Sequence, residues 1–370
     1  MIQKIKSAYE SWLKKQALIS VTQPLSFRVE SNEADYANEV GYKKLGWRHF
    51  RRALAFALSH QNGHLSHRIE RSWKKGLWLY KGIPQIGDSL MDLAPRSLLH
   101  QQGFCIDLYT DSHLAKLYSG DPWFNRVHDD PKTIASQDYD FVIVPSHKGR
   151  SLRTKSLLLP GHPWISMHGF YTGPDFHRAK FATQRIIDLL GYEASEQDFA
   201  LHQDQKLAPL AKPPAARRTI KKIAFALGGV HPSRTYQHWG QLAKALLKDQ
   251  TDKIEFTLLG SSNAVDAAQV FMNEFSETLQ AFNQVNKTSL AECRELIHQQ
   301  DLFIAVDGGL MHLGATTATR LVSLFNSEIS PLWQLSGAHL RSAIQSATRD
   351  VSDIPVNEIV KAARNALTDC

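Results

Sequence analysis

The stretch DLFIAVDGGLMHLGATTATRLVSLF, residues 301–325, holds a buried strand, a glycine turn, a helix start and a second strand in one unit. Residues 302–306 form an unbroken apolar run of strand length, residues 310–317 favour a helix, and residues 320–325 predict the next strand. This alternation is typical of a βαβ unit in a parallel sheet. The stretch therefore predicts a doubly wound α/β fold.

Four residues of this stretch lie just after its first strand, where parallel sheets bind ligands. They are Asp307, Gly308, Gly309 and His312. Two glycines let a ligand approach the backbone, and unpaired N–H groups at the start of the following helix attract an anion. A phosphate or diphosphate is the expected ligand. The alternative is ordinary turn chemistry, in which the glycines only close the loop between strand and helix.

The composition is that of a globular α/β protein. With 370 residues and 43% hydrophobic content, the chain can form two domains with separate cores. No run approaches the ~18 to 20 apolar residues of a membrane span, and the start lacks the apolar core of a secretory signal, which predicts a cytoplasmic protein. Cys105, Cys293 and Cys370 are far apart without ligand-type spacing, so neither a disulfide nor a metal site is indicated.

The formal charge of +7 is unevenly distributed. Residues 41–81 carry a single acid, Glu70, against ten basic residues: Lys43, Lys44, Arg48, Arg51, Arg52, Arg68, Arg71, Lys74, Lys75 and Lys81. Such a segment suits anionic lipid, an anionic acceptor or nucleic acid, but no nucleic-acid-binding motif accompanies it. We therefore expect no nucleic-acid partner and favour peripheral attachment to the inner membrane through Lys43 to Lys81. The alternative is a helix face exposed to water.

The order of helical and strand patterns divides the chain into four parts. Residues 206–222 (KLAPLAKPPAARRTIKK) are rich in proline and bases and form the predicted linker. We expect a helical basic extension over 1–75, a Rossmann-like domain over 76–210, a second one over 211–350 and a final helix over 351–370. Asp88 follows the first predicted strand and is expected at the N-cap of the next helix, where capping is the alternative to chemistry.

Five motifs occur in order between residues 77 and 330. They are IGDSLMDLAP with Gly87 and Asp88, a Gly228-Gly229 loop followed by His238-Trp239, LLG at 258–260, NKTSLAE at 286–292 and DGGLMHLGA at 307–315. In this order they resemble glycosyltransferase family 9, the ADP-heptose:lipopolysaccharide heptosyltransferases. The resemblance implies a GT-B architecture, with two facing Rossmann-like domains and a central cleft. It further implies metal-independent inverting transfer without a cofactor, the nucleotide sugar being a substrate.

The resemblance also implies roles for single residues. Asp88 is the candidate general base that deprotonates the acceptor hydroxyl, and Gly87 and Ser89 lie on the acceptor side in the N-terminal domain. The donor is held mainly by the C-terminal domain, through Gly228, Gly229, Asp307, Gly308, Gly309 and His312.

Three positions depart from the family pattern. Gly308 stands where Ser or Thr is usual, Gln237 where a lysine is usual, and Asn263 near the place of an acidic ribose partner. Arg234 is the predicted replacement for the missing lysine. Two functions stay open. The first is an inverting glycosyltransferase that moves heptose or a related sugar from a nucleotide-diphosphate donor to a cell-envelope glycan such as the lipopolysaccharide core. The second is a catalytically silent GT-B protein that binds nucleotide sugar or glycan as a partner subunit.

Overall fold

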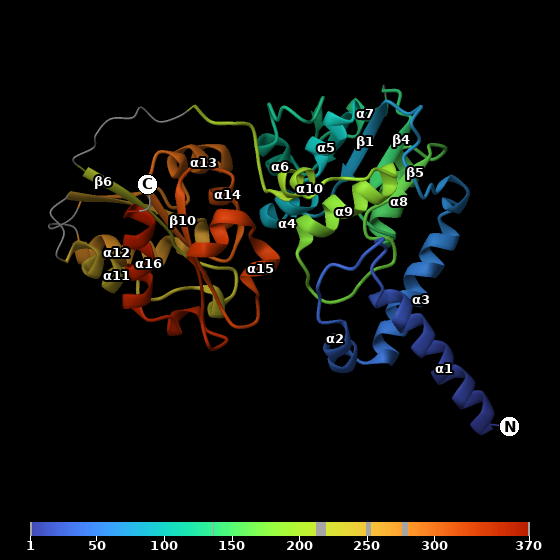
Figure 1. The fold of residues 1–370 in the computed structure, drawn as a ribbon, viewed down its shortest axis with the longest axis horizontal. Helices are drawn as coiled ribbons and strands as arrows, with labels where there is room; N and C mark the ends of the chain where they lie inside the picture. Colours follow the sequence, from blue (N-terminus) through green and yellow to red (C-terminus); the bar gives the residue numbers. More distant parts are fainter. Residues whose placement is uncertain (1, 136, 212–219, 249–252, 276–279, 369–370) are drawn as a thin grey trace. The chain divides into compact units, whose positions relative to one another are not determined.

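The chain has the parallel α/β fold that its sequence predicts, in two compact units (Figure 1). The computed structural model describes residues 2–135, 137–211, 220–248, 253–275 and 280–368. Unit 1 consists of the described residues up to 84 and of 91–204, and unit 2 of 85–90 and the described residues from 205 onward. Each unit contains one parallel sheet with helices around it, which confirms the α/β class.

The sheet of unit 1 has the strand order β3-β2-β1-β4-β5. Its strands are β1 (Lys75–Tyr80), β2 (Cys105–Thr110), β3 (Val127–His128), β4 (Phe141–Val144) and β5 (Trp164–Ser166). All neighbours pair in parallel, and Trp78, Val142 and Trp164 are buried in the core. The strand order reverses between β1 and β4, and doubly wound sheets bind ligands beyond the carboxyl ends of strands at such a switch point.

Helices surround this sheet. They are α1 (Ile2–Val21), α2 (Glu33–Val40), α3 (Tyr42–Leu58), α5 (Arg96–Gln101), α6 (Ser112–Leu117), α7 (Lys132–Ala135), α8 (Gly149–Leu158), α9 (Arg178–Leu190) and α10 (Glu196–Gln203). Helix α4 (Ile86–Asp92) begins among the residues of unit 2 and ends in unit 1. Gly191 closes α9 with a left-handed φ of 59°, as its glycine predicts.

The N-terminal extension is part of unit 1. Helices α1 and α3 approach closely at Gly46, where an added Cβ would lie 3.0 Å from Leu13 Cδ2. Helix α3 then reaches the sheet, because the Phe56 ring stacks on His147 with centroids 4.7 Å apart. Figure 1 shows α3 running beside α8, which it contacts. The predicted helical N-terminal region is therefore present and packed against the first sheet.

The prediction of helix through residues 1–75 is wrong beyond Leu58, where α3 ends. His60 has a left-handed φ of 54°, which an α-helix cannot contain. The following segment has only a short 3₁₀ turn and then borders the sheet, where the Ser66 N–H donates to Trp164 O at 2.8 Å. Hydrogen bonds to distant residues thus override the helical spacing of apolar side chains.

The sheet of unit 2 has the strand order β11-β10-β9-β6-β7-β8. Its strands are β6 (Ile220–Ala226), β7 (Lys253–Leu259), β8 (Gln280–Asn283), β9 (Leu302–Val306), β10 (Arg320–Phe325) and β11 (Ala343–Gln345). Its helices are α11 (Trp239–Leu247), α12 (Val265–Phe275), α13 (Leu290–His298), α14 (Gly309–Ala315), α15 (Pro331–Gln334) and α16 (Val356–Thr368). The strand order reverses between β6 and β9, so the loops after these two strands lie at the switch point.

Strands β9 and β10 have the predicted bounds, whereas β6 begins before the predicted linker ends. Lys222 pairs in register with Glu255 of β7, and the two side chains form an ion pair of 3.4 Å. This pairing extends β6 back to Ile220. Residues 212–219 of the predicted linker lie outside the described residues.

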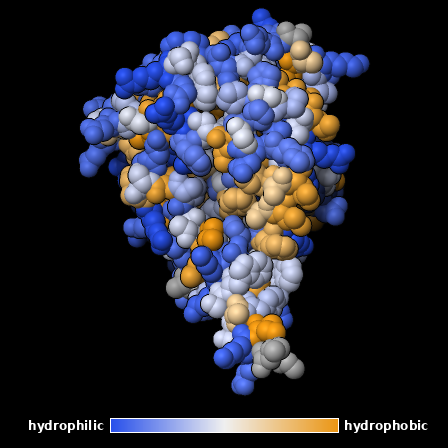
Figure 2. All heavy atoms as spheres, turned by 90° about the vertical axis from the view of Figure 1, so that its right-hand side faces the viewer, coloured by the Kyte–Doolittle hydropathy of each residue, from blue (hydrophilic) through white to orange (hydrophobic). Residues whose placement is uncertain are grey.

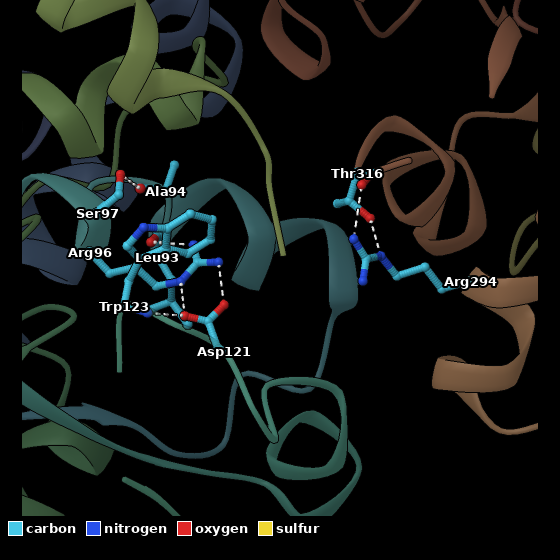
Figure 3. Close-up of polar contacts among 8 residues, drawn as sticks. All are labelled: Leu93, Ala94, Arg96, Ser97, Asp121, Trp123, Arg294 and Thr316. Carbon is cyan, nitrogen blue, oxygen red and sulfur yellow. Dashed lines mark hydrogen bonds and ion pairs between the residues drawn. The ribbon is translucent and has the colours of Figure 1, made fainter. Parts of the chain in front are cut away.

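Each unit contains a buried arginine that forms two hydrogen bonds to a residue distant in sequence (Figure 3). In unit 1, Arg96 of α5 forms an ion pair with Asp121, with Nη2 2.7 Å from Oδ2, and both side chains are buried. In unit 2, Arg294 of α13 donates to Thr316 Oγ1 at 2.9 Å and to its carbonyl at 3.0 Å. These contacts fix α5 and α13 in place, because guanidinium groups hold two acceptors in a set geometry.

Candidate functional site

The loops at the switch point of unit 2 carry the predicted donor residues. Gly228 and Gly229 follow β6, and Asp307 follows β9, its neighbour in the sheet. Gly228 has a left-handed φ of 81°, which favours glycine. A Cβ on Gly229 would lie 2.8 Å from the Arg234 carbonyl carbon, so only glycine lets this loop close. The chain therefore folds these loops tightly over the ends of β6 and β9.

Arg234 and Asp307, predicted separately, meet in the structure. Arg234 lies in a 3₁₀ turn of residues 232–234, and its Nη1 is 3.3 Å from Oδ2 of Asp307. The Asp307 side chain is 7% exposed and that of Arg234 is 42% exposed. The carboxylate thus orients a guanidinium that still faces solvent. Such a group can bind a phosphate with its remaining N–H donors.

Gly308 and Gly309 connect β9 to α14. Gly308 has a φ of 163°, which is extended backbone open to any residue, and an added Cβ would meet only Val306 O at 3.8 Å. A hydroxyl side chain would fit there, so its absence is a chemical departure from the family pattern and not a steric need. At Gly309, by contrast, a Cβ would lie 3.1 Å from Ile86 Cδ1.

His312 lies on α14 and is buried. Its Nδ1 is 2.7 Å from Gln205 Oε1, and Gln205 also donates to Gln334 O at 2.6 Å. A Cβ added to Gly87 would lie 2.7 Å from His312 Nε2. Within unit 2, glycine at residue 87 therefore lets the GD motif approach the imidazole.

Asp88 lies in the first turn of α4, which begins at Ile86. The prediction of Asp88 as the N-cap is therefore wrong, because the helix starts two residues earlier and includes it. A carboxylate in the first turn is still favoured in its ionised form by the helix dipole. Ser89 is fully buried, and its hydroxyl donates to Ile86 O at 2.8 Å within the same turn.

Gln237 and Asn263, the other departures from the family pattern, make local hydrogen bonds. Gln237 Nε2 donates to Thr235 O at 3.1 Å. Asn263 Nδ2 donates to Gly229 O at 2.8 Å. Asn263 therefore stabilises the glycine loop through this hydrogen bond.

Unit 1 has a cavity of about 620 Å³ at the carboxyl ends of β1 and β4. Basic side chains dominate its charged lining: Arg48, Arg52, Lys81, Lys148, Arg150 and Arg178. The acidic residues that line it are Asp92 and Asp175. This cavity lies at the switch point of the first sheet, where the acceptor was expected.

Asp92 is the centre of a buried polar cluster beside this cavity. Its carboxylate accepts from Arg178 Nε at 2.6 Å, Arg178 Nη2 at 2.8 Å and the Tyr80 hydroxyl at 2.9 Å. Although burial opposes ionisation, Arg178 and His168 hold the pKa of Asp92 below its usual range. Burial lowers the pKa of His168 despite the neighbouring carboxylate. Asp92 is thus a fixed anion that orients Arg178.

Sequence reasoning missed Gln205, Asp92, and Arg48 and Arg52 of α3, as site residues. Gln205 was assigned to the end of a domain, and its bond to His312 joins residues 107 positions apart. Asp92 had one local signal, because it lies one helical turn after Asp88. No group of three or more His, Cys, Asp or Glu residues placed to hold a metal occurs in the described ranges.

The two doubly wound sheets, each with ligand-type loops at its switch point, are similar to those of the GT-B class of glycosyltransferase fold. Residues 177–349 match the model of glycosyltransferase family 9 (heptosyltransferase). The resemblance drawn from the motifs is confirmed, and the family match supports a glycosyltransferase enzyme. A search of curated proteins finds no match.

Solved structures share the fold over most of the chain. A family 9 glycosyltransferase from Veillonella parvula superposes with a TM-score of 0.62 at 15% identity, covering 81% of this chain and 99% of its own. The Escherichia coli heptosyltransferase WaaC with ADP gives 0.60 at 15% identity, covering 79% and 99%. The E. coli ADP-heptose lipopolysaccharide heptosyltransferase II gives 0.56 at 17% identity, covering 79% and 98%. About a fifth of this chain therefore has no counterpart in each of these structures.

Proposed function

We propose that the chain transfers a sugar, heptose or a close relative, from a nucleotide-diphosphate donor to a cell-envelope glycan such as the lipopolysaccharide core, with inversion. Asp88 acts as the general base on the acceptor hydroxyl. Gly228, Gly229, Asp307 and Arg234 hold the donor diphosphate.

The observation that carries the proposal is the meeting of two distant motifs in unit 2. Gly87 approaches His312 so closely that no side chain fits between them. This places Asp88 on the helix that starts against the loop after β9, and Gly309 of that loop packs against Ile86. A base and a donor loop must be neighbours for an inverting displacement, because the hydroxyl attacks while the diphosphate leaves.

A thermal-shift screen with ADP, UDP and GDP, each as the free diphosphate, tests the proposal. A nucleotide at 100 times its dissociation constant adds about 2.7 kcal/mol of stability. ADP is the first choice, because the WaaC neighbour was solved with ADP. Transfer from ADP-heptose to heptose-deficient lipopolysaccharide then separates an enzyme from a silent binding protein. A chain that binds a nucleotide sugar and never releases diphosphate from it would support the silent alternative.

Arg234→Ala is expected to weaken binding of the donor diphosphate by about 1.5 to 3 kcal/mol, the range for hydrogen bonds to charged groups. The reason is that Arg234 is oriented by Asp307 and remains 42% exposed. Calorimetry with the nucleoside diphosphate measures the loss. Lys361→Ala, an exposed charge on α16 of the same unit, is the control and should bind as wild type. Unchanged affinity in Arg234→Ala would leave the backbone of the glycine loops as the phosphate site.

We also propose that unit 1 attaches to an anionic membrane through α1 and α3. None of the described helices is long and apolar enough to cross a bilayer. Large hydrophobic side chains are nevertheless exposed on α1 and α3: Ile5, Tyr9, Trp12, Leu18, Ile19, Trp47, Leu54 and Leu58. Figure 2 faces this side and shows hydrophobic patches beside hydrophilic ones. Lys43, Lys44 and Arg51 are exposed on α3. This combination suits the headgroup region of a bilayer.

The basic segment itself is not one surface. Arg48, Arg52 and Lys81 line the cavity of unit 1, and Arg68 pairs with Glu70 at 2.6 Å. Of this basic segment, we therefore assign only the exposed Lys43, Lys44 and Arg51 of α3 to membrane contact.

Changing Lys43, Lys44 and Arg51 to Ser is expected to reduce co-sedimentation with phosphatidylglycerol vesicles. Each base near an anionic surface contributes about 1 kcal/mol, and added salt should weaken the remainder. The control changes three exposed bases of unit 2, Lys248, Arg349 and Lys361, to Ser and lowers the net charge equally. Equal pelleting of the two variants would contradict attachment through α3.

A further inference from the structure

Helix α3 contributes a wall to the cavity of unit 1. Arg52 Nη1 donates to the carbonyls of Phe170 at 3.4 Å and Tyr171 at 3.1 Å. Arg48 Nη1 donates to the Tyr36 hydroxyl at 3.1 Å. The Tyr36 hydroxyl in turn donates to Thr172 O at 2.9 Å, so both guanidiniums are held beside the loop between β5 and α9, and both line the cavity.

The positive charge of this wall is not neutralised by carboxylates. Arg178 is paired with Asp92, and Lys81 lies 3.4 Å from Asp111. By contrast, no ion pair within the described part of the chain joins Arg48, Arg52 or Arg150 to an acid, and their hydrogen bonds go to neutral oxygens.

Burial and a neighbouring positive charge both affect the pKa of Arg52. Burial, and secondly the neighbouring Arg48, lower the pKa of Arg52 to about 10, so the side chain is still a cation at neutral pH. Cations gathered in a hollow focus a positive potential that attracts an anionic ligand. A guanidinium also offers paired N–H donors that match carboxylate and phosphate oxygens.

We infer that this cavity binds a glycan with at least two anionic groups, and that Arg48 and Arg52 of the N-terminal extension, together with Arg150 of α8, are its specificity-determining residues. The cavity also presents the hydroxyls of Ser151 and Thr172, which suit sugar hydroxyls. Its place at the switch point of the first sheet agrees with an acceptor site. Only the identification of this glycan as the acceptor rests on the proposed function.

Calorimetry with two soluble probes tests the inference on the full chain. The probes are glucose 1,6-bisphosphate, with phosphates, and digalacturonate, with carboxylates, and maltose is the neutral control. Wild type is expected to bind at least one acidic probe and to bind maltose at least tenfold more weakly. R48Q/R52Q is expected to lose tenfold or more in affinity for that probe, because each lost guanidinium removes charge-assisted bonds.

A matched variant on the same helix separates a built site from net charge. K44Q/R51Q removes the same charge from α3, at positions four residues before Arg48 and one residue before Arg52, but neither residue lines the cavity. It should bind the acidic probe as wild type does and should lose affinity for phosphatidylglycerol vesicles. R48Q/R52Q should keep that vesicle affinity. Equal losses of probe affinity in the two variants, or a wild type that binds maltose as well as the acidic probes, would overturn the inference. Loss of vesicle binding alone in R48Q/R52Q would assign these arginines to lipid headgroups.

R150Q is a second test of the inference, because R48Q/R52Q also removes the hydrogen bonds of Arg52 to the carbonyls of residues 170 and 171 and could destabilise the fold. Arg150 is exposed and donates to Gly82 O at 2.8 Å. If R48Q/R52Q melts at a lower temperature than wild type, the probe affinity of R150Q is the deciding measurement. Unchanged probe affinity in R150Q would then overturn the inference. ADP affinity is measured in parallel. Normal ADP binding in R48Q/R52Q would show that these arginines are not part of the donor site. A wild-type protein that binds an acidic probe but no nucleotide would contradict the proposed function and leave the inference about this cavity standing.

Discussion

Asp88→Asn is expected to lower the rate of sugar transfer by about 10²- to 10⁴-fold, the usual share of general-base catalysis. Donor affinity and melting temperature should stay close to wild type. The amide keeps the size of the carboxylate and removes its ability to take a proton. Asp88 lies in the first turn of α4, whose dipole favours the anion and lowers its basicity, so acceptor binding must partly desolvate the carboxylate. Release of diphosphate from ADP-heptose with heptose-deficient lipopolysaccharide measures the rate.

Glu358→Gln is the matched control, because Glu358 is an exposed carboxylate in the first turn of α16 in the same unit. It should transfer sugar at the wild-type rate. Near-full transfer by Asp88→Asn would move the base elsewhere, and His312, whose ring lies beside Gly87, would be examined first. His147 is a weaker candidate, since burial lowers its pKa to about 4 and its ring is stacked on Phe56.

Arg96→Met is expected to lower the stability of unit 1 by about 3 to 5 kcal/mol, the cost of leaving a buried charge without its partner. Arg96 grips Asp121 through Nε at 3.1 Å and Nη2 at 2.7 Å, and the two side chains are 0% and 1% exposed. The guanidinium also lies 4.8 Å from the Trp123 ring centroid, so its loss removes packing as well as charge. Urea unfolding followed by near-ultraviolet circular dichroism reports the shift in midpoint.

Arg349→Met serves as the comparison, because the Arg349–Glu328 pair is exposed and such pairs contribute about 0 to 1 kcal/mol. The double variant Arg96→Met with Asp121→Leu should recover much of the lost stability, since it leaves no unpaired ion. Similar midpoints for Arg96→Met and Arg349→Met would refute the assigned role of the buried pair.

The sequence predicted the fold where the pattern is local. Strands β9 and β10 have their predicted bounds, because burial on both faces makes parallel strands continuously apolar. The segment after Leu58 could not be predicted in this way. Its conformation depends on hydrogen bonds to β5, which lies about a hundred residues further along the chain.

The residues of the candidate site likewise fall into those that a local motif predicts and those that only a long-range contact brings in. Asp307, Gly309 and His312 were predicted because they follow a strand within one short motif. The Arg234–Asp307 pair and the Gln205–His312 contact could not be, since each joins segments separated by a large part of unit 2. The basic segment was seen only as a sum of charges. Its separation into a cavity wall and an exposed face depends on which side of α3 each residue occupies, and that is set by the contact of α3 with the loop before α9.

The docking of α3 on that loop has a consequence for synthesis on the ribosome. Arg52 precedes its acceptor Tyr171 by 119 residues. At about 5 to 20 residues per second, this interval lasts roughly 6 to 24 s. During that time Phe56 and Arg52 have emerged while the surfaces that cover them have not been made. The hydrophobic side chains of the N-terminal helices are therefore exposed in the nascent chain before the loop that covers them is made.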